Sequence, residues 1–339
     1  MITHSLEKLI NSQDLSRMET ETVFTQIMQG AATAPQIAAL LTAMRMKSES
    51  IEEITGAASI MRELAVSLDI KSKLIMDTCG TGGSGKHAFN VSTLTALVVS
   101  AAGITVAKHG NRGISSKSGS ADLLEALGVN INAKPEITQK CINEIGIGFM
   151  YAPLFHQATK YAAGVRRELG FRTIFNILGP LTNPARATHQ LLGVFNPDLC
   201  EPMARVLRNL GLTHALVVHG NDGIDEVTTS DSTTVCEMRD GEINSYIITP
   251  EQFHLNRASI KDIQISGLEE SKKAALEILH GKTSPIYDFV VLNSGCALYT
   301  AESVSSIKKG IELAIEILNE GKALAKLESL KIMTNENNS

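Results

Sequence analysis

The sequence contains no tryptophan, and aromatic residues make up only 4% of its 339 positions. Proteins that bind single-stranded nucleic acids stack bases on aromatic side chains, so this composition argues against that class. The formal net charge of -5 also lacks the basic excess of a general nucleic-acid binder. We therefore expect no nucleic-acid partner, and we expect any phosphate-bearing ligand to be held by local donors.

Long apolar runs are missing as well. No stretch reaches about 18 uninterrupted apolar residues, so we expect no membrane span. The N-terminus lacks a basic segment followed by an apolar core, which predicts no signal peptide. The five cysteines are odd in number and scattered, so they indicate neither a disulfide framework nor a metal cluster. Free thiols are typical of a reducing cytoplasm, where we expect the protein to reside.

Residues 1–70 are predicted to be helical throughout and to form a small all-helical domain. Ser16 with Glu19, and Ser50 with Glu53, have the spacing of capping boxes at helix starts. Apolar residues recur at helical spacing between these starts. No titratable groups cluster here, so we expect a packing module that offers a candidate dimer surface, which helices from about 155–185 could join.

Residues 71–333 show a different pattern, in which short apolar runs alternate with helical stretches. This alternation predicts an α/β fold with a mostly parallel central sheet flanked by helices. The expected strands lie at 74–76, 104–107, 147–151, 190–195 and 214–219, and the expected helices at 91–102, 120–128, 135–145, 155–169 and 198–210. Asp240-Gly241 predicts an antiparallel hairpin within 233–249, and helices return over 268–330.

A glycine-rich loop follows the first expected strand. Glycines at 80, 82, 83 and 85 precede Asn90-Val91-Ser92-Thr93, where an apolar helix begins. Backbone amides of such a loop, with the free N–H groups of a helix N-terminus, make an anion site. The spacing matches neither the G-x-G-x-x-G nor the Walker signature. The pattern favours a phosphate or pyrophosphate cradle over a simple connecting turn.

Two further segments follow expected strands. Lys108-His109-Gly110-Asn111-Arg112 combines cations, an amide and a glycine, which suits a phosphate-bearing ligand, although alone it could be a flexible polar loop. Asp225-Glu226 could hold Mg²⁺, which prefers oxygen ligands, but the spacing alone favours a solvated turn. Because ligands bind at the carboxyl ends of parallel strands, these segments and the glycine loop could share one crevice.

These residues carry a resemblance to a known family. Gly80-Thr81-Gly82-Gly83, Phe89 to Thr93 and Lys108 to Arg112 closely resemble the anthranilate phosphoribosyltransferase family. The resemblance continues through 164–167 and 172–184 to Asp225-Glu226. It implies an enzyme that joins anthranilate to phosphoribosyl pyrophosphate with Mg²⁺, in the second step of tryptophan biosynthesis from chorismate. It also implies a homodimer that uses the small helical domain.

The resemblance also implies roles for individual residues. Anthranilate is expected to meet Gly80, Asn111 and Arg166, the last through the substrate carboxylate, and Mg²⁺ to meet Ser92, Asp225 and Glu226. His109, His156 and Pro180 are weaker candidates for lining the same pocket, and no residue is assigned as an acid or base. Phosphoribosyl pyrophosphate is expected to contact Gly80, Thr81, Gly82, Gly83, Ser84, Ala88, Asn90, Val91, Ser92, Thr93, Lys108, His109, Gly110, Asn111, Arg112, Gly113, Ile114, Ser115, Ser116 and Ser120.

Two positions depart from the family pattern. Ser84 stands where the family usually has Asp, and Ala88 stands where it often has Thr. The first change puts in doubt a metal-linked or loop-ordering role at that position, for which Lys86 could compensate.

Two alternative functions stay open. A pyrimidine nucleoside phosphorylase would share the fold and the phosphate loop, and a non-catalytic relative could bind nucleic acid.

Overall fold

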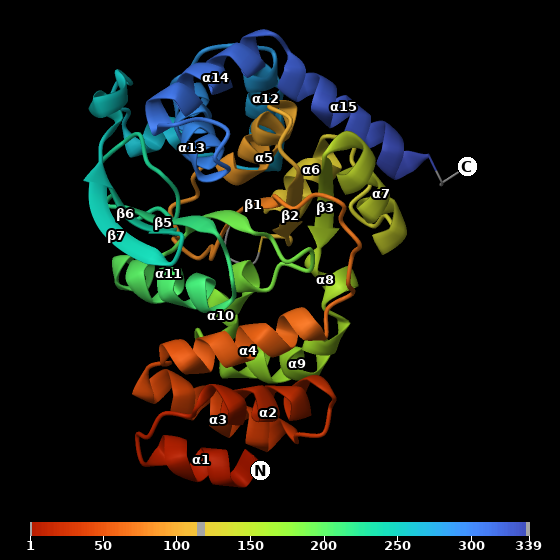
Figure 1. Ribbon diagram of the computed structural model, residues 1–339, viewed down its shortest axis with the longest axis vertical. Helices are drawn as coiled ribbons and strands as arrows, with labels where there is room; N and C mark the ends of the chain where they lie inside the picture. The colour runs from red at the N-terminus through yellow and green to blue at the C-terminus, as the bar shows by residue number, and fades with distance from the viewer. Residues whose placement is uncertain (1, 114–118, 337–339) are drawn as a thin grey trace.

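The computed structural model describes residues 2–113 and 119–336 and consists of a helical region below an α/β region (Figure 1). The lower region is built mainly from α1 (Ile2–Ile10), α2 (Arg17–Met28), α3 (Ala34–Lys47) and α4 (Ile51–Glu63). Helix α9 (Lys160–Leu169), far along the chain, packs against α2 and α3. The described part of the chain contains no helix with the length and apolarity that crossing a bilayer requires.

Local signals define the starts of these helices. The predicted capping boxes of α2 and α4 are both present, with Ser16 and Ser50 accepting from the backbone N–H groups of Glu19 and Glu53. The expectation of helix up to residue 70 is wrong, because the helix ends at Glu63 and residues 65–75 form an irregular connection. Side chains of α7 accept hydrogen bonds from backbone amides of this connection, so those amides have partners outside a helix.

One seven-stranded sheet in the order β3-β2-β1-β4-β5-β6-β7 forms the centre of the described structure. The first five strands in this order are parallel, and β6 and β7 are antiparallel additions at one edge. Asp240 and Gly241, with φ of 50° and 85°, form the predicted hairpin turn. The strands are β1 (Met76–Gly80), β2 (Val106–Gly110), β3 (Ile147–Tyr151), β4 (His189–Gly193), β5 (His214–Gly220), β6 (Thr233–Arg239) and β7 (Glu242–Ile248).

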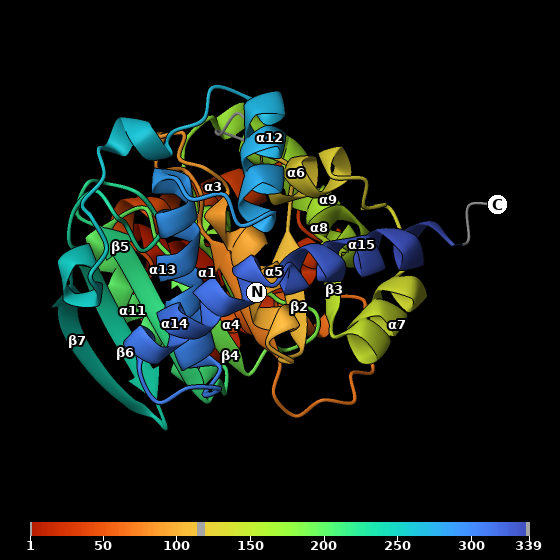
Figure 2. The same ribbon diagram turned by 90° about the horizontal axis from the view of Figure 1, so that it is seen from above.

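Helices cover both faces of the sheet (Figures 1 and 2). The α5, α13, α14 and α15 side shares one apolar core with the sheet, and the opposite face shares a second core with α11 and the helical region. The predicted fold class is confirmed. The remaining helices are α5 (Val91–Ala101), α6 (Ser120–Ala126), α7 (Pro135–Ile145), α8 (Ala152–Phe155), α10 (Phe175–Leu178), α11 (Cys200–Asn209), α12 (Leu268–Leu279), α13 (Pro285–Thr300), α14 (Ile307–Asn319) and α15 (Lys322–Asn335).

The single helix expected over 155–169 is wrong. Helix α8 already ends at Phe155, a short 3₁₀ turn follows at Gln157–Thr159, and α9 begins only at Lys160. His156 breaks the first helix, since its φ and ψ of -116° and 55° lie outside the helical region. The break lets the chain leave the edge of the sheet and reach the helical region.

The strand order also sets the position of a ligand crevice. Starting from β1, the chain first builds β2 and β3 on one side and then returns to build β4 and β5 on the other. The order therefore reverses between β1 and β4. In open parallel sheets, ligands bind beyond the carboxyl ends of the strands at such a reversal. The loops after β1, β2 and β5 all leave the sheet at the carboxyl ends of these parallel strands.

Candidate functional site

The loop after β1 has the geometry of an anion cradle. Gly82, Gly83 and Gly85 have φ of 65°, 84° and 69°, a region that residues with a Cβ rarely adopt. The loop ends at Asn90, the residue before α5, whose side-chain Oδ1 accepts from the hydroxyl of Thr93 at 2.7 Å. The backbone therefore curves tightly with little side-chain bulk, directly before a helix N-terminus.

Contacts from three distant segments hold this loop. The N–H of Gly82 donates to Oδ2 of Asp225 at 2.8 Å, and Arg172 donates to the carbonyl oxygen of Gly83 at 2.5 Å. On the far side, the side-chain amide of Gln264 donates to the carbonyl oxygen of Lys86 at 2.8 Å. Sequence reasoning did not predict Arg172 or Gln264 as site residues. Arg172 lies within a motif that carried the resemblance, but nothing in the sequence singled out Gln264.

The side chain of Lys108, which was expected to contact phosphate, is buried and does not face solvent. Its side chain, in a residue only 3% exposed, donates to the carbonyl oxygen of Thr78 at 2.5 Å and to the hydroxyl of Ser92 at 3.1 Å. Burial lowers the pKa of Lys108, and the buried carboxylate of Asp77 opposes this shift. The ammonium group thus links the end of β1 to the first turn of α5, on either side of the glycine loop.

Asp225 and Glu226 lie against the same loop. A Cβ added to Gly193, at the end of β4, would fall 1.6 Å from the carbonyl oxygen of Asp225, so the acidic segment passes directly over that glycine. Both acids are half-buried. Burial, and then the charge of Asp225, raise the pKa of Glu226 well above its ordinary value, while Lys108 opposes them. Two adjacent carboxylates at this depth favour a cation between them.

The donor set consists of oxygen atoms, which Mg²⁺ prefers as ligands. No group of three or more His, Cys, Asp or Glu residues is arranged to hold a metal within residues 2–113 and 119–336. Mg²⁺ does not need such a cage, because it keeps several waters and takes one or two carboxylates together with substrate phosphates. Ser92, whose hydroxyl accepts from Lys108, adds an oxygen near the start of α5.

The loop after β2 is only partly described, because the predicted residues Ile114, Ser115 and Ser116 lie outside the described residues. Arg112 is paired with two acids of α6, Asp122 at 3.0 Å and Glu125 at 2.7 Å. A phosphate contact would therefore require its guanidinium group to exchange these partners. Asn111 accepts the hydroxyl of Ser120 through its carbonyl oxygen at 3.4 Å, which brings the two predicted residues together.

Several predicted contact residues have little side-chain freedom. The side chain of Val91 is buried in the core, and its N–H donates to the carbonyl oxygen of Phe89 at 2.8 Å. Ala88 pairs with Gln264 in an isolated antiparallel bridge. These two residues therefore shape the loop through their backbones. Of the remaining predicted residues, Gly80 is the last residue of β1, Thr81 and Ser84 belong to the loop after β1, and Gly113 belongs to the loop after β2.

Arg166, the predicted carboxylate ligand, lies on α9. Its guanidinium lies 5.0 Å from the centre of the Phe175 ring, it is half-buried, and burial lowers its pKa. It forms no ion pair or side-chain hydrogen bond within the described part of the chain. The neighbouring Arg167 is exposed. A partly desolvated arginine without a carboxylate partner is suited to bind a carboxylate ligand in two-pronged fashion.

His109 and His156 meet edge to face, with ring centroids 5.0 Å apart. Burial, the largest cause for each, lowers the pKa of His109 to about 3 and that of His156 to about 4. Both imidazoles are therefore neutral near pH 7. Their Nε2 atoms have no hydrogen-bond partner in the described structure. The carbonyl oxygen of Pro180, the third weaker candidate, accepts from the side-chain amide of Gln190 at 2.7 Å.

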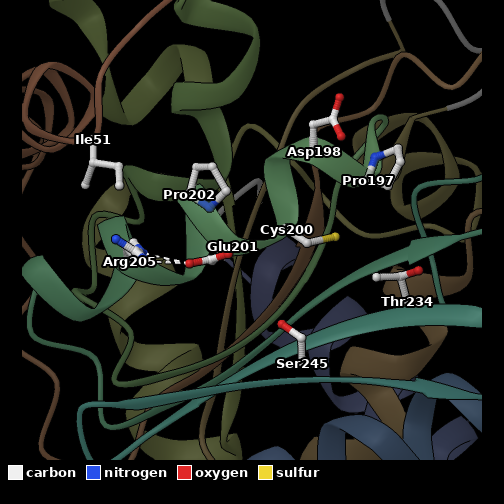
Figure 3. A pocket seen from close by; sticks show the side chains of 9 residues that line it. All are labelled: Ile51, Pro197, Asp198, Cys200, Glu201, Pro202, Arg205, Thr234 and Ser245. Carbon is white, nitrogen blue, oxygen red and sulfur yellow. Dashed lines mark hydrogen bonds and ion pairs between the residues drawn. The ribbon is translucent and has the colours of Figure 1, made fainter.

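A separate cavity of about 520 Å³ lies elsewhere, between α11 and the β6–β7 hairpin (Figure 3). Arg205 lines it and is paired with Glu201 of the same helix. None of the predicted site residues lines this cavity. The convergence of loops at the carboxyl ends of the strands, and not this cavity, therefore marks the candidate active site.

Comparisons with known proteins identify the family of this chain. Residues 72–324 match the model of the glycosyl transferase family, a/b domain, and residues 3–65 match the helical bundle domain of the same family. The anthranilate phosphoribosyltransferase of Acetivibrio thermocellus is 51% identical over 335 residues, which cover 99% of this chain and 97% of the relative. The enzyme of the same name from Symbiobacterium thermophilum is 48% identical, with 97% and 96% covered.

Solved structures give the same result. The anthranilate phosphoribosyltransferase of Thermus thermophilus superposes with a TM-score of 0.92 at 41% identity, covering 97% of this chain and 99% of that one. The Saccharomyces cerevisiae enzyme in complex with PRPP (phosphoribosyl pyrophosphate) and Mg gives 0.90 at 27% identity, with 99% and 98% covered. The sequence identities of 51% and 48% to the first two relatives, over almost the whole length of the chain, show common descent. This chain therefore belongs to the anthranilate phosphoribosyltransferase family.

Proposed function

We propose that this chain transfers the 5-phosphoribosyl group from phosphoribosyl pyrophosphate to the amine of anthranilate. The products are N-(5-phosphoribosyl)anthranilate and pyrophosphate, in the second step of tryptophan biosynthesis from chorismate. Family membership over nearly the whole chain supports the reaction. The single structural observation that carries it is the 2.8 Å hydrogen bond from the N–H of Gly82 to Asp225, which joins the anion loop to the acidic pair.

The glycine loop and the first turn of α5 are proposed to hold the pyrophosphate. Amides of Gly83, Ser84 and Gly85 and the hydroxyl of Ser92 supply donors on one side. Asn111 and Ser120 close the other side. Asp225 and Glu226, with Ser92, would hold Mg²⁺, which neutralises charge on the diphosphate when bound. The related yeast enzyme was solved in complex with PRPP and Mg, which supports the use of this metal.

Catalysis in this proposal is positioning together with electrostatic stabilisation. The C1–O bond of the ribose breaks, and the electron pair leaves with pyrophosphate, which the loop amides stabilise. The neutral aromatic amine forms the new C1–N bond and then releases one proton. No base in the site is required to start the attack, because the amine already carries its lone pair. The buried, neutral His109 and His156 fit a role in shaping the site.

Arg166 is proposed to bind the carboxylate of anthranilate, with Asn111 and Gly80 at the ring. The arginine lies on α9, which packs on the helical region, whereas Gly80 ends β1 of the sheet. The two substrates would then meet between the helical region and the carboxyl ends of the strands. Closure of these parts would exclude water, which competes with the amine for the ribosyl cation.

We also infer a homodimer that pairs through the helical region. Ile10, Met18 and Met46, all in this region, are exposed by 73%, 74% and 83%. Apolar side chains this exposed are common at interfaces. Light scattering during gel filtration at micromolar concentration tests this, and a mass of one chain would refute it.

All five cysteines are free and buried, which is consistent with a reducing cytoplasm as the location.

One assay tests the reaction. Anthranilate fluorescence should fall when phosphoribosyl pyrophosphate and Mg²⁺ are both supplied, and it should stay constant when either is omitted. Thymidine and phosphate in place of these substrates should give no reaction. Phosphorolysis of thymidine without consumption of anthranilate would instead favour the nucleoside phosphorylase alternative. The relatives compared above carry the name of the anthranilate enzyme, so no second function is proposed.

A further inference from the structure

One buried amide outside the substrate-facing loops contacts the acidic segment directly. Asn293 lies in the middle of α13, a helix of the core, and is only 1% exposed. Its Oδ1 accepts the backbone N–H of Val227 at 3.1 Å. Its Nδ2 donates to the carbonyl oxygens of Val227 and Phe289, both at 2.8 Å. Both donor hydrogens and the oxygen of this side chain therefore have partners.

The geometry of these bonds restricts the neighbouring acid. Val227 directly follows Glu226, and Asn293 binds both the N–H and the carbonyl oxygen of that one residue. The N–H of Val227 belongs to the peptide group that begins at Glu226, so the amide fixes the orientation of this peptide. Since the Cα of Glu226 belongs to the same plane, the starting point of its side chain is fixed as well.

A buried position in the middle of a helix ordinarily favours an aliphatic residue over asparagine. Asparagine has a lower helix propensity than leucine, and burying its amide is costly unless every hydrogen bond is made. Here two of the three bonds leave the helix and reach a loop 66 residues away in the sequence. An aliphatic side chain could fill the space, but it could not satisfy the backbone of Val227.

We propose that Asn293 is a positioning residue for the metal site, holding Glu226 in place through the backbone of Val227. This inference rests on the proposed metal role of Asp225 and Glu226. Residues that orient metal ligands commonly change metal affinity or activity by about 10- to 100-fold when they are replaced. Loss of the amide should therefore appear in the magnesium dependence and not in the binding of the aromatic substrate.

The test uses the full-length enzyme with Asn293→Leu and Asn293→Asp. Asp keeps the shape and the acceptor for Val227 but loses the donor, so it provides the comparison even if Leu prevents folding. Turnover is titrated with Mg²⁺, and KM is measured for each substrate well below the melting temperature. We expect the Mg²⁺ concentration for half-maximal turnover and the KM for phosphoribosyl pyrophosphate to rise about tenfold. The KM for anthranilate should change less than twofold.

Ser294→Ala is the matched control. This neighbour on α13 is equally buried, and its hydroxyl has no partner in the described structure. It should leave the magnesium titration unchanged. A merely structural role for Asn293 would lower thermal stability and the active fraction while both KM values and the magnesium midpoint stay as in the parent. That result, or an equal rise of both KM values, would overturn the inference.

The double variant Asp225→Asn with Glu226→Gln separates this inference from its premise. If the double variant shifts the magnesium titration and the Asn293 variants do not, the positioning role is wrong and the metal assignment stands. If the double variant keeps the parent titration and kcat, the metal assignment itself is wrong. In that case a shift caused by Asn293 could not act through Glu226.

Discussion

Replacing Arg166 with alanine should weaken the capture of anthranilate selectively. The guanidinium is half-buried, stacks at 5.0 Å on Phe175 and has no carboxylate partner in the described structure. A hydrogen bond to a charged group contributes about 1.5–3 kcal/mol. Because Arg166 remains partly in contact with solvent, we take the lower part of this range, about 1.5–2 kcal/mol. This corresponds to a rise of about 10- to 30-fold in the KM for anthranilate.

The assay follows the loss of anthranilate fluorescence at saturating phosphoribosyl pyrophosphate and Mg²⁺, and then with each substrate varied in turn. The KM for phosphoribosyl pyrophosphate should stay within twofold of the parent value. Arg166→Lys keeps the charge but loses the planar fork, so it should fall between the parent and the alanine variant. Arg167→Ala is the matched control, because this neighbour is exposed.

Three outcomes would refute the reasoning. An equal rise in both KM values would mean that Arg166 acts on the fold of the crevice and not on the carboxylate. A comparable effect of Arg167→Ala would mean that general positive charge on α9, and not one oriented guanidinium, attracts anthranilate. A loss of kcat alone would also remove Arg166 from ground-state binding.

Gly193 and the two buried histidines provide the remaining predictions. Gly193→Ala places a Cβ 1.6 Å from the carbonyl oxygen of Asp225, so the acidic segment must shift and the Mg²⁺ needed for half-maximal turnover should rise about tenfold. Gly164→Ala, where a Cβ meets nothing within 4 Å, is its control. His109 and His156 have lowered pKa values of about 3 and 4, so their unfolded forms bind protons first as the pH falls below 6.5. The free energy of unfolding should therefore decrease by about 2 kcal/mol per imidazole between pH 7 and pH 5, as measured by denaturant titrations. His156→Asn should make this dependence of stability on pH less steep. An unchanged dependence in the variant would contradict the prediction.

Features that depend on a few neighbouring residues were predictable from the sequence. The capping boxes at Ser16 and Ser50, the hairpin at Asp240-Gly241 and the alternation of strands with helices are all present. The errors occur where tertiary partners replace local hydrogen bonds. Residues 65–75 leave the helix and bind side chains of α7, and the chain breaks at His156 to reach the helical region.

The sequence by itself determined where the glycines, hydroxyls and acids of the site stand relative to their own strands and helices, because those relations extend over only a few residues. The tertiary structure decided which of these groups meet. Gly82 and Asp225 are 143 residues apart, and they meet because the strand order places β4 between β1 and β5. The same packing buries Lys108 and brings Asn293 to Val227. Contacts of this length depend on how whole elements pack, and no short pattern in the chain encodes them.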